Sequence, residues 1–153
     1  MEKNNRYTAY TDGGYHLYKN EGAYAFVILQ DGEILHKCSR VIRNESNNRA
    51  ELKAIVDAVA WCPDGSEILV RSDSQYAINT LKGDWQRKKN TDIFKEWDRI
   101  VSTKNVNVSF EWVRGHKGDK YNEMCDKMCD EAVGYDLNAW IPKKKQTTKT
   151  PDK

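Results

Sequence analysis

The sequence predicts an α/β protein in which a mixed five-stranded sheet is flanked by helices. Two observations support this fold class. Three strand-like segments come first and are joined by short turns, and the rest of the chain follows the order helix, strand, helix, helix, strand, helix. This order is typical of a mixed sheet with helices packed against it. A chain of 153 residues is also long enough for one ordinary domain with a single substantial core.

The first third of the chain is expected to form three strands. Arg6–Thr11 alternates apolar and polar residues and stops at Asp12-Gly13-Gly14, which indicates a strand that ends there. The segments Ala23–Gln30 and Glu33–Ile42 flank Asp31-Gly32, a strong signal for a two-residue hairpin. These three segments therefore start the sheet.

Helical periodicity begins in the next segment. Asn48–Trp61 places its aliphatic residues on one helical face, and Pro63-Asp64-Gly65 ends the helix. The elements expected after it are a strand over Glu67–Ser72, a helix over Ser74–Leu81, a helix over Asp92–Val101, a strand over Val106–Val113 and a helix over Lys120–Val133. The pattern shows no internal repeat and no domain boundary before the C-terminal tail.

The net charge of +2 is unevenly distributed along the chain. Residues 141–153 contain five lysines and one aspartate without apolar periodicity, so we expect a disordered tail after a folded domain over residues 1–140. The domain itself carries 20 basic and 22 acidic residues. It is therefore not a generally basic nucleic-acid binder, and we expect it to bind a polyanion only through local patches or bound metal.

The cysteine pattern points to a reducing compartment. The four cysteines form no CxxC pair, and Cys125 and Cys129, four residues apart on one expected helix, suit core packing better than a zinc site. Reduced thiols are typical of intracellular proteins. The chain also has no signal peptide and no apolar stretch of about 18 residues. We therefore expect a cytoplasmic protein with no membrane association.

Four acidic residues occupy positions that local folding rules would not choose. Asp12 and Asp73 lie where strands end, and Glu51 and Asp126 fall on the apolar sides of expected helices. Taken singly, such residues have ordinary explanations, as a turn aspartate, a helix-start glutamate or an N-cap. Together they predict buried carboxylates, which need a compensating charge. A divalent metal such as magnesium supplies that charge, so the sequence favours a metal-dependent phosphoryl-transfer site.

The residues around these acids form motifs that are specific in combination. The motifs are Thr11-Asp12-Gly13-Gly14, Asn47-Asn48-Arg49-Ala50-Glu51-Leu52, Ser72-Asp73-Ser74-Gln75-Tyr76, Trp112-Val113-Arg114-Gly115-His116-Lys117-Gly118 and Asn122-Glu123-Met124-Cys125-Asp126. They closely resemble the motifs of type 1 ribonuclease H, and the match runs in order from about Tyr7 to Val133. The resemblance implies the ribonuclease H fold and endonucleolytic cleavage of the RNA strand in RNA–DNA hybrids.

The resemblance also implies roles for individual residues. Asp12, Glu51, Asp73 and Asp126 fall on the family's metal-binding catalytic acids, and His116 falls on its mobile-loop histidine. A two-metal site clamps the attacking and leaving oxygens of an in-line displacement. We therefore expect two magnesium ions, with manganese as a substitute, and products with 5′-phosphate and 3′-hydroxyl ends. His116 would transfer a proton or assist product release, unless it is an ordinary loop histidine.

A second group of residues resembles the family's substrate contacts. These are Asn47, Asn48 and Gln75 for the minor groove, Ser46 and Asn90 for DNA phosphates, and Tyr76 and Trp85 for stacking or packing along the DNA strand. Amide side chains suit the first role because they can both donate to and accept from the 2′-hydroxyl that marks RNA. The alternatives are helix capping or surface polarity for the polar residues, and core packing for Trp85.

Two departures from the family pattern concern substrate binding. The stretch Tyr15–Gly22 replaces a glycine–asparagine–proline–glycine turn, and Asp84–Lys89 is too short for the basic protrusion that some members carry. We therefore expect weaker and more salt-sensitive hybrid binding than in relatives with the protrusion. Arg87, Lys88 and Lys89 could compensate in part, although such a triplet is usually a solvated run of charge.

The sequence alone leaves other functions open. A non-catalytic hybrid-binding module could keep the fold, but it would gain nothing from burying four acids near phosphates. Another nuclease on the same fold is a second alternative, against which the Asn-Asn-Arg and Asp-Ser-Gln contexts favour hybrid recognition. A third is a domain of a larger polymerase-linked polypeptide, although Met1 and the complete last helix favour a free-standing enzyme. We expect a monomer, and no protein partner can be inferred.

Overall fold

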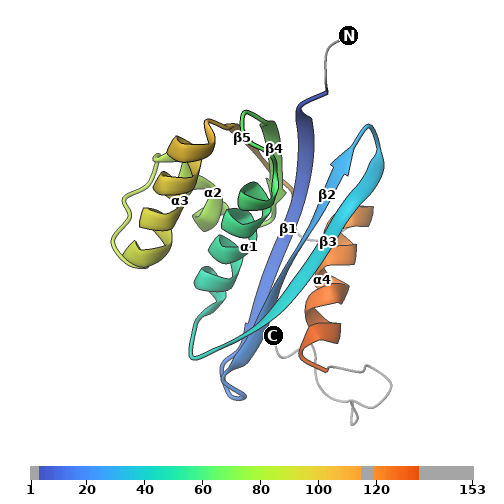
Figure 1. Ribbon diagram of the computed structural model, residues 1–153. Coiled ribbons are helices and arrows are strands. Elements are labelled where there is room, and N and C mark those ends of the chain that lie inside the picture. Colours follow the sequence, from blue (N-terminus) through green and yellow to red (C-terminus); the bar gives the residue numbers. More distant parts are fainter. Residues whose placement is uncertain (1–3, 115–118, 135–153) are drawn as a thin grey trace.

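The computed structural model of the protein describes residues 4–114 and 119–134. Its elements follow one another in the predicted order (Figure 1). They are β1 (Arg6–His16), β2 (Glu21–Gln30), β3 (Glu33–Arg43), α1 (Asn47–Trp61), β4 (Glu67–Ser72), α2 (Gln75–Lys82), α3 (Thr91–Lys104), β5 (Asn107–Trp112) and α4 (Lys120–Ala132).

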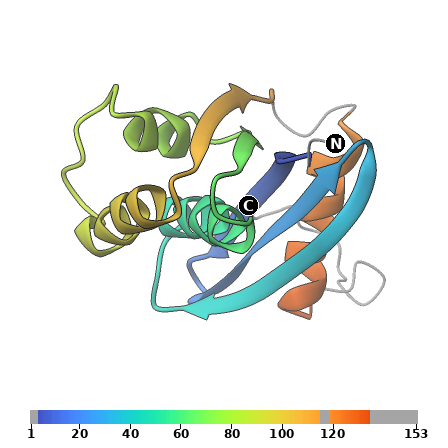
Figure 2. The same cartoon turned by 45° about the horizontal axis from the view of Figure 1, so that its top comes forward.

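The five strands form one mixed sheet in the order β3-β2-β1-β4-β5. The hairpin-linked strands β1, β2 and β3 pair antiparallel, whereas β1 with β4 and β4 with β5 pair parallel. This confirms the predicted mixed five-stranded sheet. Figure 2 shows the sheet from a second direction, with the long strands β1 to β3 on one side and the shorter β4 and β5 on the other.

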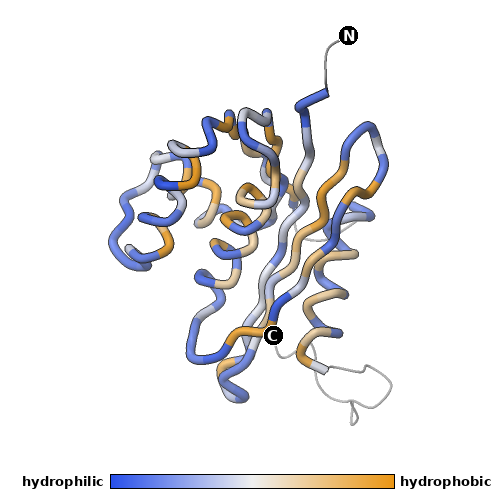
Figure 3. Tube along the Cα trace, viewed as in Figure 1, coloured by the Kyte–Doolittle hydropathy of each residue, from blue (hydrophilic) through white to orange (hydrophobic). Residues whose placement is uncertain are grey.

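Helices cover both faces of the sheet and divide the core into layers. Helix α1, backed by α3, packs on one face through a cluster that includes Phe26 and Ile28 of β2. Helix α4 packs on the other face against β1 and β2, where Ala25 and Val27 contact Cys125 and its neighbours (Figure 1). Strand β2 is therefore buried from both sides, which explains its continuous hydrophobic stretch in Figure 3.

The first strand is longer than the sequence predicts. We expected it to end at Thr11, but β1 continues through Asp12, Gly13 and Gly14 to His16 and stays paired with β2. The two glycines therefore do not form a turn. A side chain at Gly13 would place its Cβ 2.6 Å from the backbone carbonyl carbon of Ala50, so glycine is needed there for the close approach of α1.

Serines, and not the predicted acidic residue, cap the two helices next to the site. Ser46 is the N-cap of α1, which starts at Asn47, one residue earlier than predicted, and its hydroxyl accepts a hydrogen bond from the Arg49 amide. Ser74 caps α2 and accepts from the Ala77 amide. A capping role for Asp73 is therefore wrong, which leaves its carboxylate for another purpose.

Within the described residues, no helix combines the length and the apolar character needed to cross a bilayer.

Candidate active site

Three of the four predicted acids converge at one place. Asp12 comes from β1, Glu51 from α1, and Asp73 follows the last residue of β4. Each offers a carboxylate oxygen, and these three oxygens all lie within 4.8 Å of one another. Residues that are 22 to 61 positions apart in the chain therefore form one acidic cluster.

The sheet topology explains this convergence. The parallel pairing of β1 with β4 ends at Tyr10 and Arg71, so Asp12 and Asp73 both lie two residues beyond it on neighbouring strands. Glu51 reaches the same point because the absence of a side chain at Gly13 brings the first turn of α1 against β1. The cluster thus lies just beyond the point where the parallel pairing of β1 with β4 ends, at the carboxyl end of β4, a position typical of ligand binding in open α/β sheets.

Burial makes the cluster electrostatically unfavourable on its own. The exposed fractions of Asp12 and Glu51 are 3% and 7%, and Asp73 is half-buried. The pKa of Glu51 is raised well above its ordinary value, first by burial and then by the charges of Asp12 and Asp73. Its Oε1 atom is buried and has no hydrogen-bond partner among the described residues. Burial and the mutual repulsion of these acids therefore favour the binding of a cation at the cluster.

A divalent cation fits this arrangement. The donor set consists of carboxylate oxygens, which are the ligands that hard cations such as magnesium and manganese prefer. A bound cation would offset the repulsion that raises the pKa of Glu51 and would satisfy its buried oxygen. The residues that would hold it are Asp12, Glu51 and Asp73.

The fourth predicted acid lies at the edge of the same pocket. Asp126 of α4 lines a hollow of about 500 Å³ together with the acidic cluster, but it is not among the carboxylates within 4.8 Å of one another. Asp130, one helical turn later, lines the hollow as well and was missed from the sequence. The four-residue spacing of the two aspartates on one helix was the signal that could have found it.

The predicted substrate contacts separate into two groups. Asn47 and Asn48, at the start of α1, line the same hollow as the acids. The others are not among its lining residues: Ser46 as the N-cap of α1, Gln75 at the exposed start of α2, Tyr76 and Asn90 hydrogen-bonded to each other, and Trp85. Trp85 is 47% exposed, so the core-packing alternative for it is wrong. His116 lies outside the described residues.

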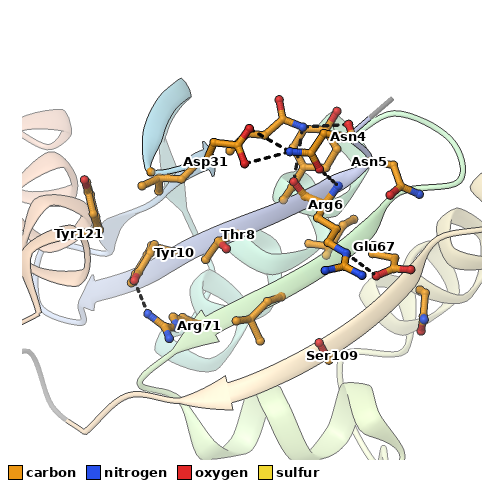
Figure 4. Close-up of a pocket in the computed structure, with 17 residues that line it drawn as sticks. Asn4, Asn5, Arg6, Thr8, Tyr10, Asp31, Glu67, Arg71, Ser109 and Tyr121 are labelled. Carbon is orange, nitrogen blue, oxygen red and sulfur yellow. Dashed lines mark hydrogen bonds and ion pairs between the residues drawn. The ribbon is translucent and has the colours of Figure 1, made fainter. Parts of the chain in front are cut away.

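A larger hollow of about 1010 Å³ lies on the open face of β1, β4 and β5 (Figure 4). Its charged residues are paired with other residues that line it: Asn4 donates to Asp31, Arg6 forms an ion pair with Glu67, and the Arg71 guanidinium donates to the Tyr10 hydroxyl. None of the clustered acids lines it. We therefore assign the functional site to the smaller hollow, because the acidic cluster lines it.

Comparisons with known proteins agree with this assignment. The family model for RNase H matches residues 4–134. A ribonuclease H from Clostridium botulinum is 31% identical over 141 residues, which cover 81% of this chain and 93% of that protein. A ribonuclease HI from Synechocystis sp. is 28% identical over 139 residues, covering 81% of this chain and 85% of that protein.

A solved structure also matches the fold. The crystal structure of LC11-RNase H1 in complex with an RNA/DNA hybrid aligns with a TM-score of 0.70 and 26% sequence identity. The alignment covers 83% of this chain and 96% of that one. The similarity therefore extends over most of the chain and nearly all of the solved structure.

Proposed function

This chain belongs to the ribonuclease H family, and we propose that it cleaves the RNA strand of RNA–DNA hybrids with two magnesium ions held by Asp12, Glu51, Asp73 and Asp126. Ribonucleases H are metal-dependent endoribonucleases, and the metal requirement agrees with the acidic cluster. The identity of the metal, the number of ions and the roles of the individual residues are the parts that we infer. Manganese would substitute for magnesium because it prefers the same oxygen ligands.

The observation that carries the proposal is the convergence of three carboxylates, two of them almost fully buried and one, Glu51, with a raised pKa. Three carboxylate oxygens within 4.8 Å of one another, two of them on residues that are almost fully buried, are unfavourable unless cations bind. A module that only binds nucleic acid would gain nothing from this cluster, because it repels phosphates when no metal is present. The arrangement is therefore useful in a protein that binds a metal ion next to a phosphate group.

The chemistry needs no nucleophile from the protein. Bound divalent ions would activate the attacking water and stabilise the departing 3′ oxygen, which gives 5′-phosphate and 3′-hydroxyl ends. The role of the chain is to hold the carboxylates at fixed positions, and the Gly13 amide contributes by donating a hydrogen bond of 2.9 Å to Oδ1 of Asp12. His116 is inferred to move a proton or to assist product release.

Substrate recognition is inferred to involve both strands. Asn47 and Asn48 line the hollow beside the acids, which supports a role in reading the 2′-hydroxyl groups of the RNA strand. Gln75 is inferred to contact the minor groove as well. Ser46 and Asn90 are inferred to contact phosphates of the DNA strand, and Tyr76 and Trp85 to contact the same strand. The related LC11-RNase H1 was crystallised with an RNA/DNA hybrid, which supports the same substrate class for this chain.

We further infer how the chain is organised and where it works. Residues 1–140 would form the catalytic domain, and the lysine-rich residues 141–153 would form a separate tail. A cytoplasmic location is supported by the four cysteines, all of which are free thiols. We also infer that the protein acts as a monomer, since Asp12, Glu51 and Asp73 can meet without a residue from a second copy.

The test is cleavage of end-labelled substrates. We expect the RNA strand of an RNA–DNA hybrid to be cut with magnesium or manganese and not with EDTA, and double-stranded RNA, double-stranded DNA and single-stranded RNA to stay intact. Asp12→Asn and Asp73→Asn should each abolish cutting while leaving the protein folded. Asp64→Asn is the matched control, because Asp64 is an exposed surface aspartate paired with Lys104, and its activity should be unchanged.

Purified protein that binds the hybrid but never cuts it in either metal would contradict the proposal. Such a result would favour a binding module that retained the fold. Cutting of single strands in preference to hybrids would instead identify another nuclease activity on the same fold.

A further inference from the structure

One charged residue connects the start of α1 with the start of α3. The Arg49 guanidinium donates to Oε1 of Glu45 at 2.8 Å, to both carboxylate oxygens of Asp92 at 2.9 and 2.7 Å, and to Oδ1 of Asn90 at 3.2 Å. Its side chain is only 24% exposed. Lys53 pairs with the second oxygen of Glu45, so the two acids of this cluster are matched by two bases.

These contacts determine which way the Asn90 amide points. A guanidinium has only hydrogen-bond donors, so the Asn90 atom that faces Arg49 must be the carbonyl oxygen Oδ1. The amide nitrogen Nδ2 is then turned towards Tyr76 and donates to its hydroxyl oxygen at 3.0 Å. The orientation of the Asn90 amide is therefore determined by the donor-only guanidinium of Arg49.

The same logic extends one step further, to the Tyr76 hydroxyl. Its oxygen already accepts from Asn90, so its proton is available to donate. No described residue accepts that proton. The Asn90 side chain, although Asn90 is the N-cap of α3, makes no capping hydrogen bond, because Arg49 and Tyr76 hold it. One remaining amide proton and one hydroxyl proton are thus left without described acceptors.

The Asn90 amide and the Tyr76 hydroxyl each keep a proton to donate, and the acidic and basic side chains around Arg49 already balance one another. Such a set of donors suits a negatively charged partner. Ser46 belongs to the same group, because its hydroxyl oxygen accepts from the Arg49 amide and its proton is also left to donate. Two exposed lysines, Lys88 and Lys89, precede Asn90 directly in the chain. A phosphate oxygen is the acceptor that such a set of hydroxyl and amide donors fits best.

We propose that Arg49 is a positioning residue that fixes the Asn90 amide and thereby makes the Tyr76 hydroxyl a hydrogen-bond donor to a phosphate of the substrate's DNA strand. The inference rests on the proposed function, since it presumes a hybrid substrate. It gives Tyr76 a contact through its oxygen, in place of the stacking through its ring that the sequence predicted. The acids of the cleavage site take no part in it.

The test measures binding separately from cleavage. Hybrid affinity is determined in an Asp12→Asn background, so that substrate is bound but not cut, and Tyr76→Phe removes only the hydroxyl group. We expect Tyr76→Phe to weaken hybrid binding by about tenfold, the usual effect of losing one hydrogen bond to a charged group. In the protein with an intact Asp12, it should raise KM with little change in kcat.

A set of hybrids identifies the partner of the hydroxyl. Each carries one neutral methylphosphonate at a different position of the DNA strand. At one position, we expect the substitution to weaken binding to the protein with Tyr76 but to cause no further loss with Tyr76→Phe. Stacking by the ring predicts instead that the two proteins respond alike at every position, because phenylalanine keeps the ring.

Arg49→Lys tests the positioning step. Lysine keeps the charge but cannot bind Glu45, Asp92 and Asn90 together, so the amide is free to turn. We expect Arg49→Lys to weaken binding and to remove most of the additional effect of Tyr76→Phe in the double variant. Tyr121→Phe is the matched control, because Tyr121 lies on α4 beside Tyr10, beside the larger hollow (Figure 4), and should bind hybrid like the unmodified protein.

Three results would overturn the inference. They are unchanged affinity of Tyr76→Phe, an affinity loss that is coupled to no DNA phosphate, and strictly additive effects of Arg49→Lys and Tyr76→Phe. Any of them would leave the proposed function intact as long as the unmodified chain cuts hybrid RNA. Failure of the unmodified chain to bind hybrid at all would overturn both.

Discussion

Glu51 is the residue at which burial and charge conflict most directly. It lies one turn into α1 and is almost fully buried, with two aspartates close by. One of its carboxylate oxygens has no hydrogen-bond partner in the described part of the chain. A helix-start glutamate would ordinarily be solvated and favoured by the helix dipole. Its position here is unfavourable for folding and favourable for metal binding, which is the usual trade-off at a functional site.

We predict that Glu51→Gln stabilises the metal-free protein at neutral pH. The pKa of Glu51 is raised in the folded state, so the protonated carboxyl stabilises the fold relative to the ionised one. This stabilisation is fully present below the ordinary pKa and is lost as pH rises through the folded-state pKa. Glutamine keeps the shape without the charge. In EDTA at pH 7.5, urea unfolding should show a gain on the order of 1–2 kcal/mol, and the gain should shrink near the ordinary pKa of 4.5.

Magnesium should reverse the order of stability, because only the carboxylate binds the ion well. Glu33→Gln is the control, since Glu33 is exposed on β3 and its substitution should change stability little at either pH. Equal stability of Glu51→Gln and the unmodified protein at pH 7.5 in EDTA would argue against a buried, uncompensated carboxylate.

Individual acids could be identified from the sequence because they interrupt apolar patterns. Glu51 lies on the same helical face as Ile55 and Ala58, and the structure buries all three. Asp130 was missed because a second aspartate on an amphipathic helix looks like ordinary solvent-facing charge. Arg49 was part of a quoted motif, but its contacts with Asp92 and Asn90 span about 40 residues and depend on how α1 and α3 pack.

At the level of elements, the contact between β1 and α1 places the acids. Strand β1 carries Asp12, and α1 carries Glu51, so their separation depends on how closely the helix approaches the strand. A Cβ atom at Gly13 would lie 2.6 Å from the Ala50 carbonyl carbon and 2.7 Å from the Glu51 nitrogen. These are backbone atoms, so they cannot move aside as the end of a flexible side chain could.

We predict that Gly13→Ala destabilises the protein by about 1–3 kcal/mol, the usual cost of overpacking. The helix must move away from the strand, so metal affinity should fall as well. Gly14→Ala is the matched control, because a Cβ there meets nothing within 4 Å, and its unfolding free energy should change little. Thermal or urea unfolding compares the stabilities of the two variants, and calorimetric titration of magnesium compares their metal affinities. Equal stabilities of the two variants would contradict the prediction.

Element types were predictable because their local signals are strong. The Asp31-Gly32 hairpin, the alternating strands and the periodic helices all appear in the expected order. The end of β1 was predicted wrongly because Asp12-Gly13-Gly14 has the composition of a turn. Only the approach of α1 shows why glycine occupies the interior of that strand.

Arg87 shows that a residue within a run of basic residues can stabilise the fold. Its guanidinium donates to the carbonyls of Thr80 and Leu81 at the end of α2, pairs with Asp98 of α3, and lies over the Phe94 ring. It thereby supplies a donor to the Leu81 carbonyl and a second donor to the Thr80 carbonyl, which also accepts from the Gly83 amide, at the end of the helix where intrahelical donors run out. Of the basic triplet, only Lys88 and Lys89 are left exposed to meet a substrate.

At the scale of the whole molecule, the sheet order decides which residues meet. Strand β1 lies at the centre, between the antiparallel β2 and the parallel β4, so the part of β1 that follows Tyr10 lies beyond the carboxyl end of its pairing with β4. The sequence could indicate five strands and their mixed character. It could not supply the pairing register, which places Asp12 and Asp73 at matching distances beyond the last paired residues.

Charge over the whole molecule limits how the protein binds a polyanion. Residues 1–140 carry a small excess of acidic residues, and Arg49, Arg71 and Arg87 are engaged in ion pairs within the fold. Binding must therefore depend on few phosphate contacts, assisted by bound metal. Fewer contacts lower the affinity, and they also make log K fall less steeply with log salt. We therefore keep the expectation of weaker binding than in relatives with the protrusion, but we replace the expectation of greater salt sensitivity with that of a shallower slope.

We predict that Lys88 and Lys89 supply ionic contacts to the hybrid and that Arg87 does not. In the Asp12→Asn background with magnesium fixed, replacing both lysines by alanine should reduce the slope of log K against log salt by about 1 to 2, as expected for the loss of two phosphate contacts. Arg87→Ala should lower stability while leaving the slope unchanged, because its guanidinium is bound within the fold. Lys37→Ala, an exposed change on β3, controls for net charge. A slope that responds to Arg87 or Lys37 as strongly as to the two lysines would mean that binding depends on overall charge, and the segment between α2 and α3 would then have no special part in holding the substrate.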